Sequence, residues 1–200
     1  MARRIGGLYF GGDAYVEIQN SPLFNPEESF SLVVWFNPAF LPPDETWRLF
    51  QREAGTWGMF IDTASRLRFY VDTRDAGGEW LSADYVLPAN RLYFVVGVYR
   101  FNEQIELWVD CELKDSVEQS YRVDQGTKNP RIGADPLGMN FFKGLIPQIR
   151  IYNVALSQSQ IWELYKNPYA QVEMEHCVLW LPFTEGMGVI CLLYTSPSPR

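Results

Sequence analysis

Pairs of carboxylates are the first side chains in this sequence that could do chemistry. Retaining cleavage of a glycosidic bond needs two carboxyl groups roughly 5–5.5 Å apart, which on a strand means residues two or four apart on one face. Glu103 and Glu106 are three apart and fall on opposite faces. Glu173 and Glu175 have the right spacing, and His176, the one histidine, follows them. This segment is a candidate metal or acid–base site; the alternative is a solvated linker.

Other catalytic motifs are missing from the sequence. There is no Glu-x-Asp-x-x-Glu run, no Gly-x-Ser-x-Gly, no glycine-rich phosphate loop and no Cys-x-x-Cys. The sequence therefore predicts a chain that is not an enzyme, and a glycoside hydrolase is the weakest of the functional alternatives.

Aromatic side chains next to loops are the second group with chemical potential. Sugar recognition stacks a pyranose on an aromatic ring while polar side chains hold its hydroxyls, and rings with a polar tip suit half-wet sites. The candidate ligand-binding residues are three aromatics with three polar neighbours: Trp57, Trp80, Tyr85, Asp75, Asp135 and Asn140. The alternative for Trp57 and Trp80 is the edge of the core. The loop of residues 135–142 carries apolar side chains that either stay exposed or close the end of the fold.

Charge and hydropathy exclude several partners. The chain has 200 residues, with 17 basic and 24 acidic side chains and a net charge of −7. A basic face that could neutralise phosphates is absent, so we expect no nucleic acid as partner and no attraction to an anionic membrane. The longest apolar run, residues 92–99, is far shorter than the roughly 20 residues that span a bilayer, so we expect no membrane insertion. No secretory signal is read at the N-terminus.

Short apolar segments at regular intervals must position these residues. Turn signals separate nearly all of them, and no helical pattern lies between them, so the sequence predicts an all-β antiparallel sandwich or barrel. Pro147 predicts an edge position or a bulge in the last segment. The predicted strands are 14–18, 30–36, 47–52, 57–62, 66–71, 80–86, 91–99, 104–110, 112–114, 131–133 and 143–152.

One helix is predicted over residues 157–166. Ser157 and Gln160 have the spacing of a capping box, and Ile161, Leu164 and Tyr165 form one apolar face. Asn167 and the proline after it end the helix.

The last ten residues, 191–200, break with the preceding pattern. They resemble the translation of an adapter used to prepare DNA sequencing libraries; the alternative is a native Ser/Pro linker. Without them two cysteines remain, Cys111 and Cys177, and neither lies in a motif for zinc or for a reactive thiol. A disulfide between the two is left open by their spacing.

Five segments in order resemble laminin-G-like, concanavalin-A-type jelly-roll domains over about residues 8–166. Residues 8–18 are similar to the family's opening, and residues 29–38 to its Phe-Thr-x-x-x-Trp-Val-x-Pro strand. Residues 107–113 match its Tyr-Val-Asp-Gly-Glu hairpin, and residues 131–133 its Ile-Gly pair. Residues 142–161 match Phe-x-Gly-x-Ile-Asp-Glu-Val-Arg-Ile-Tyr-Asn followed by Ala-Leu-Ser-x-x-x-Ile. The resemblance implies a two-sheet antiparallel jelly-roll sandwich with the short helix at its C-terminal end.

Three departures from the family matter, and two of them bear on calcium, which many members bind. The first turn reads Phe10-Gly11-Gly12 instead of Phe-Asp-Gly, and Pro147 and Gln148 replace two carboxylates. Cys111 takes the place of the hairpin glycine. Calcium needs six to eight oxygen ligands, so these losses weigh against the site. Asp13 remains a candidate calcium ligand; the alternative is a turn residue that bonds its own backbone.

The segment 178–190 resembles the family's first strand, Trp-Pro-Phe-x-Glu-Gly-x-Gly. It is either the start of a second repeat or a closing strand of the same sandwich. The expected organisation is a jelly-roll domain over 1–170, a linker over 171–177, this segment, and the adapter-like tail.

The resemblance implies a non-catalytic module that binds carbohydrate or glycoprotein, within a larger extracellular or cell-surface protein. The alternative is a structural or adhesion spacer repeat without a small ligand.

Overall fold

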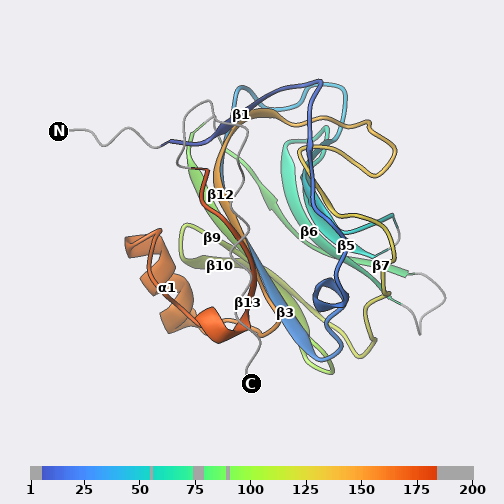
Figure 1. Cartoon of the computed structure of the whole chain (residues 1–200), viewed down its shortest axis with the longest axis vertical. Coiled ribbons are helices and arrows are strands. Elements are labelled where there is room, and N and C mark those ends of the chain that lie inside the picture. The colour runs from blue at the N-terminus through green and yellow to red at the C-terminus, as the bar shows by residue number, and fades with distance from the viewer. Residues whose placement is uncertain (1–5, 55, 74–78, 89–90, 184–200) are drawn as a thin grey trace.

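The computed structural model describes residues 6–54, 56–73, 79–88 and 91–183. Within these ranges the strands form two antiparallel sheets that face each other (Figure 1). The first sheet runs in the order β1 (Leu8–Gly11), β12 (Lys143–Tyr152), β3 (Ser29–Pro38), β8 (Tyr93–Arg100), β9 (Gln104–Val109) and β10 (Glu112–Glu118), and β13 (Cys177–Leu181) also pairs with β12. The second runs in the order β2 (Val16–Glu17), β11 (Arg131–Ile132), β4 (Trp47–Gln51), β5 (Trp57–Ile61), β6 (Arg66–Thr73) and β7 (Glu79–Val86). The predicted all-β sandwich is confirmed.

Alternating side chains build the core between the sheets. In β3, Leu32, Val34 and Phe36 point into this core, whereas Val33 and Trp35 belong to a second apolar cluster on the opposite face of the same sheet. Because β3 is buried on both faces, its sequence is an almost continuous apolar run rather than an alternating one.

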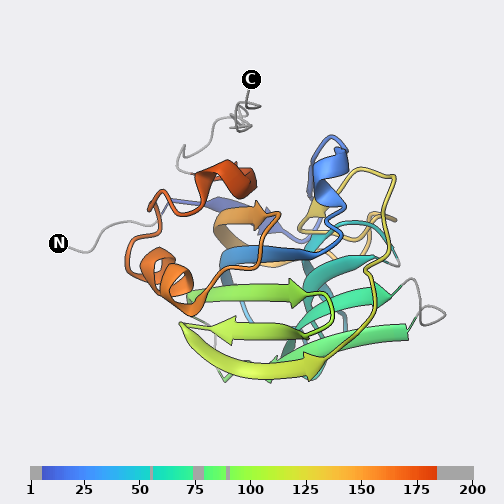
Figure 2. The same ribbon diagram turned by 90° about the horizontal axis from the view of Figure 1, so that it is seen from below.

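The helix α1 (Gln158–Lys166) covers the second cluster, on the side of the first sheet that faces away from the second sheet (Figures 1 and 2). Ile161 and Leu164 are its buried residues. The predicted capping box is present: Gln160 N donates to Ser157 Oγ at 3.4 Å and Ser157 N donates to Gln160 Oε1 at 2.8 Å. The helix therefore starts where its sequence predicts and docks through the predicted face.

Pro147 produces a bulge inside the sheet. The register between β12 and β3 shifts between Leu145 and Gln148. The edge position, the other predicted option, is wrong, because β12 has β3 on one side and both β1 and β13 on the other. The proline lacks an N–H for the ladder, so the bulge accommodates it.

One hairpin turn and two 3₁₀ turns are described between the strands. The hairpin between β9 and β10 places Asp110 and Cys111 at φ values of 50° and 71°. Cys111 thus stands where the family has glycine, in a conformation that a side chain makes costly. Two 3₁₀ turns, η1 (Pro22–Phe24) and η2 (Met174–His176), lie outside the sheets.

Residues 171–177, predicted as a linker, pack on this domain instead. Val172 and Cys177 are buried in the cluster beneath α1, and this burial of apolar surface holds the segment in place. The strand β13 follows and pairs with β12 from Leu181 opposite Ile149 to Cys177 opposite Tyr152. The described part of 178–190 therefore lies in the same sandwich, and a second repeat stays a prediction.

No helix among the described residues is long and apolar enough to cross a bilayer.

Candidate functional site

One of the predicted aromatic platforms, Trp57, lies in the core. Trp57 is fully buried between Phe30 and Phe50, with ring centroids 4.5 and 5.1 Å away. Its Nε1 donates to the carbonyl of Phe24 at 3.3 Å. The prediction of Trp57 as a stacking surface fails for this reason: both faces of its ring are in the core, where its large apolar area belongs.

The other strand and loop candidates are only partly placed. Tyr85 is half-buried on β7, with Lys114 Nζ 5.2 Å above its ring. The backbone of Trp80 pairs with Asp72, but its side chain lies outside the described part of the structure, as does all of Asp75. Trp80 and Asp75 therefore stay predictions.

Asp135 and Asn140 do meet. Asp135 Oδ2 accepts from Asn140 Nδ2 at 2.6 Å, and its Oδ1 accepts from the backbone N–H groups of Leu137 and Met139 at 2.9 and 2.8 Å. These bonds show that the Asp135 carboxylate orders its own loop. Leu137 and Met139 remain 77% and 52% exposed at its tip, while Phe142 closes the sandwich end.

Asp13 is exposed beside Gly11 and Gly12. Among the described residues, it joins no group of three acidic, histidine or cysteine side chains close enough to share an ion. Calcium also takes backbone oxygens, so the ion at Asp13 stays a prediction.

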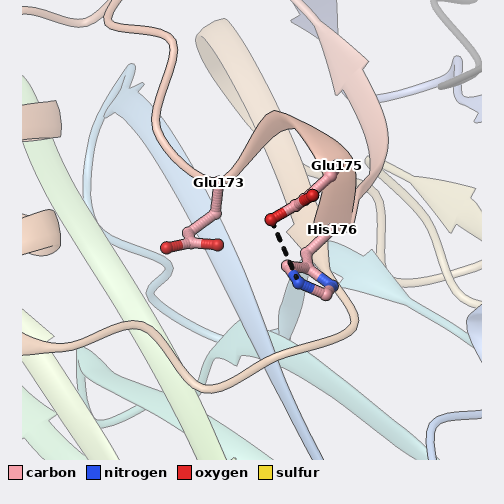
Figure 3. Close-up of side chains that lie close together, drawn as sticks. All are labelled: Glu173, Glu175 and His176. Carbon is pink, nitrogen blue, oxygen red and sulfur yellow. Dashed lines mark ion pairs between the residues drawn. The ribbon is translucent and has the colours of Figure 1, made fainter.

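Glu173, Glu175 and His176 do form such a group, with ligand atoms within 4.8 Å of one another (Figure 3). They gather at η2, and His176 Nε2 lies 3.7 Å from Glu175 Oε1. Two of them also have a partner elsewhere in the fold: His176 Nδ1 lies 3.2 Å from Asn153 Oδ1, and Glu173 accepts from Gln160. The set is mostly open to water, where carboxylates are stable without an ion.

Both described cysteines are free thiols. Burial raises the pKa of the Cys177 thiol to about 11, and Cys177 Sγ donates to the carbonyl of Leu179 at 3.3 Å. Burial also raises the pKa of Cys111. A thiol with a raised pKa is a poor nucleophile at neutral pH, so neither cysteine is set up for thiol chemistry.

A groove of about 480 Å³ lies between the C-terminal end of α1 and the outer face of the first sheet. That volume is within the range of roughly 300–1,000 Å³ typical of ligand sites. The lining residues combine aromatic rings with charged and amide side chains: Trp35, Arg91, Leu92, Phe94, Asp110, Pro147, Gln148, Tyr165, Lys166, Asn167, Pro168 and Tyr169.

The aromatic rings of this groove form a connected series. The centroids of Trp35 and Phe94 are 4.6 Å apart, and Tyr165 lies 5.5 Å beyond Phe94. Trp162 continues the series 5.9 Å from Tyr165, on the outer side of α1. Trp35 and Phe94 are buried, whereas Trp162, Tyr165 and Tyr169 are 40–50% exposed. The groove therefore has a packed floor and open rings at its rim.

Polar contacts hold the walls. Asp110 Oδ1 accepts from the backbone N–H of Phe94 at 3.1 Å, and its Oδ2 accepts from Arg91, whose guanidinium also lies 4.1 Å from the ring centroid of Tyr93. The hydrogen bond to Asp110 raises the pKa of Arg91, so this side chain stays charged. The hairpin turn between β9 and β10 thus places an ion pair at one end of the groove.

On the opposite side of the groove, Gln148 and Arg150 hold the segment that follows α1. Gln148 Nε2 donates to the carbonyl of Pro168 at 2.7 Å, and its Oε1 accepts from Trp180 Nε1 at 2.9 Å. Arg150, fully buried, donates to the carbonyls of Pro168 and Ala170. These bonds fix the segment that carries Tyr169.

Sequence reasoning missed this site. Trp35 and Phe94 lie in the apolar cluster beneath α1, and Tyr165 belongs to the predicted apolar face of the helix. The groove lies where the C-terminal end of the helix meets the sheet, and a sequence shows no signal for such a gap. The aromatic after the helix-ending Asn167-Pro168, Tyr169, was the available clue.

A model of the family described as concanavalin A-like lectin/glucanases superfamily matches residues 10–162. A search of curated protein sequences found no match.

Similar solved structures include three with complementary coverage. A putative carbohydrate binding protein from Bacteroides ovatus has a TM-score of 0.68 and 16% identity, over 94% of this chain and 56% of that one. The CBM40 of Ruminococcus gnavus IT-sialidase, bound to α2,3-sialyllactose, has a TM-score of 0.64 and 15% identity, over 80% and 96%. Domains LG4-5 of the mouse laminin α1 chain have a TM-score of 0.55 and 15% identity, over 76% and 44%. The chain thus spans about half the length of two of the three.

Proposed function

Because the chain belongs to the concanavalin A-like lectin/glucanase superfamily, we propose that it is a non-catalytic carbohydrate-binding module and that the groove beside α1 is its sugar site. The observation that carries this proposal is that two exposed rings, Tyr165 and Tyr169, line the groove together with a packed aromatic floor. A pyranose presents an apolar face to such rings, and its hydroxyls need nearby polar partners. Asp110, Arg91 and Lys166 are placed to serve as those partners.

Two structural relatives support a sugar as the class of ligand. One is called a putative carbohydrate binding protein, and the other is bound to a sialylated trisaccharide. At 15–16% identity these relatives show a shared fold, so the ligand rests on analogy together with the groove. A glycan or glycoprotein outside the cell or on its surface is the partner that we propose.

The non-catalytic part of the proposal rests on the carboxylates. Asp110, the acidic residue of the groove, is engaged by Arg91 and by a backbone N–H. Hydrolysis needs a second carboxyl group across the scissile bond, and among the lining residues none is acidic apart from Asp110.

Binding to an array of neutral and sialylated oligosaccharides tests the proposal. For a glycan that binds the wild type, Tyr165→Ala should weaken affinity about tenfold, because a stacked ring contributes on the order of 1 kcal/mol beyond its buried area. Tyr9→Ala is the matched control, since Tyr9 is an exposed ring on β1, outside the groove.

A wild type that binds no glycan would reject the proposal and favour the spacer alternative. Equal loss in the Tyr9 and Tyr165 variants would place the sugar elsewhere.

A further inference from the structure

Arg48 differs from every other arginine that the structure describes. Arg52, Arg66, Arg68, Arg91, Arg100, Arg122, Arg131 and Arg150 all donate side-chain hydrogen bonds to a carboxylate, carbonyl or amide oxygen. Arg48 donates none, and its Nε and Nη1 are buried without an acceptor. A guanidinium carries five N–H donors and stays charged, so this is an unused cation within an acidic protein.

The position of Arg48 is on the outer face of the second sheet. Its neighbours Trp47 and Leu49 point into the core, so its side chain points the other way. It pairs across the strands with Phe60, and the guanidinium lies 4.4 Å from the Phe60 ring centroid and 5.8 Å from that of Tyr70. Gly58, in the row of Tyr70, adds no side chain to this face.

The nearby acidic side chains are already occupied. Arg68, which lies opposite Phe60 on the next strand, forms ion pairs with Asp62 and Asp84. The N···O distances are 3.0 and 3.5 Å. The Asp135 carboxylate oxygens bond their own loop, which docks on β4 where Arg48 N donates to the carbonyl of Asn140 at 3.0 Å, and the Asp135 charge acts on the Arg48 guanidinium only from beyond ion-pair distance. The fold thus supplies a cation with aromatic backing and no counter-charge within ion-pair distance among the described residues.

We infer that Arg48 is the anchor of a second binding site, for a ligand that carries a carboxylate group. Arginine binds a planar carboxylate through two parallel N–H···O bonds, and the pairing is stronger where water is partly excluded. Arg48 is partly exposed and Nη2 is not among its buried atoms, so we expect an anion to reach Nη2 first. Nη1 must move off the rings to form the second N–H···O bond to the carboxylate, and this movement breaks no hydrogen bond. Any other described arginine would lose a hydrogen bond if it turned to such a ligand.

This site is independent of the groove, which lies on the outer face of the other sheet. Its ligand is either an acidic sugar or a small free carboxylate, since both offer the same group. D-glucuronate, with D-glucose as its neutral match and acetate as the bare carboxylate, separates these sources.

The direct experiment follows the arginine Nε–H signals of the wild-type protein by NMR during titration with millimolar D-glucuronate. The Arg48 signal, identified by its loss in Arg48→Lys, should shift, and D-glucose should leave it in place. Arg48→Gln should weaken glucuronate binding at least about tenfold, the loss typical of one charge-assisted pair. Arg48→Lys keeps the charge but not the planar fork, so it should bind with intermediate affinity.

Arg122→Gln is the matched control. Its guanidinium also lies over a phenylalanine, 4.3 Å from the Phe101 ring centroid, but it already contacts Glu28 at 3.2 Å. It should bind glucuronate like the wild type, and so should Tyr165→Ala, which separates this site from the groove.

Tighter binding of glucuronate than acetate assigns the site to an acidic sugar, and equal binding assigns it to small carboxylates. An unmoved Arg48 signal, an equal response to glucose, or an Arg48→Gln variant that binds as before would overturn the inference. The NMR titration is done on the wild type, and a variant is needed only to assign the Arg48 signal.

Discussion

At the scale of single residues, several aspartate side chains of this protein accept hydrogen bonds from backbone N–H groups. Asp135 orders its loop, Asp110 holds the hairpin turn to β8, and Asp62 organises the turn between β5 and β6. Asp135 and Asp62 accept from backbone N–H groups of their own turns, whereas Asp110 accepts from a backbone N–H of β8. This pattern explains why Asp135 and Asn140, predicted to hold a ligand, are found bonded to each other. Residue type alone does not separate a turn-forming aspartate from a ligand-binding one.

Asp62 provides a prediction at this scale. Burial raises its pKa, but hydrogen bonds from the Arg66 backbone and side chain, from the Ala64 N–H and from Arg68 outweigh burial, so its pKa is lowered. A lowered pKa stabilises the fold above the ordinary value of 3.8, and the stability is lost as the pH falls through the folded-state pKa. Asp62→Asn should therefore destabilise the protein at pH 7, by about 1–3 kcal/mol.

Urea unfolding of wild type and Asp62→Asn at a series of pH values checks this. The gap between the two should narrow as the pH falls below 3.8. A gap that stays constant down to pH 2 would show that the charge of Asp62 contributes nothing.

At the scale of elements, the sequence predicts what local patterns encode. The helix start at Ser157, the strand that contains Trp35 and the irregularity at Pro147 all follow from spacing and side-chain geometry. The groove does not, because it depends on how far α1 extends over the sheet. The arginine site does not either, since nothing in the sequence tells whether Arg48 finds an acceptor.

The capping box gives a prediction for α1. Ser157→Ala removes the side-chain acceptor of the Gln160 N–H and should lower the free energy of unfolding by about 1 kcal/mol. Ser159→Ala, two residues further on and exposed, removes only the contact of its hydroxyl with Ser157 Oγ at 3.0 Å and should have a smaller effect. Thermal unfolding of both variants decides; equal effects would mean that the cap does not define the helix start.

The strand β13 gives the second prediction for elements. Leu179 is 2% exposed and lies in the core between the sheets. Leu179→Ala should lower the free energy of unfolding by about 2–5 kcal/mol, with the 58% exposed Val86 as the site of a control Val86→Ala. A neutral Leu179→Ala would mean that this segment belongs to another repeat and only rests on the sheet.

At the scale of the whole molecule, the sandwich leaves two outer faces with different chemistry. One is partly covered by α1 and carries the aromatic groove. The other carries charged rows, with Arg68 neutralised and Arg48 not. The overall fold was predictable from five family-like segments, whereas the surfaces that bind were not, since they depend on packing between distant segments.

Calcium is tested at this scale, because an ion that binds only the folded state stabilises the whole fold by mass action. If Asp13 is a ligand, millimolar calcium should raise the melting temperature above that in EDTA, and Asp13→Asn should abolish the rise. An unchanged melting temperature would mean that the missing carboxylates at Pro147 and Gln148 removed the site.

β1 and β13 share one edge of β12, each pairing with a different part of it. Both β1 and β13 run antiparallel to β12, with Leu181 opposite Ile149 and Leu8 opposite Ile146. β13 therefore ends where β1 begins, and the two read as one interrupted strand, which is the place that the family's first strand would take before residue 8. A circular permutant that starts near Val172, joins residue 183 to residue 7 through a short linker and ends at Ala170 should keep the same sheet. The same sheet can therefore form with the chain ends at a different place in the sequence.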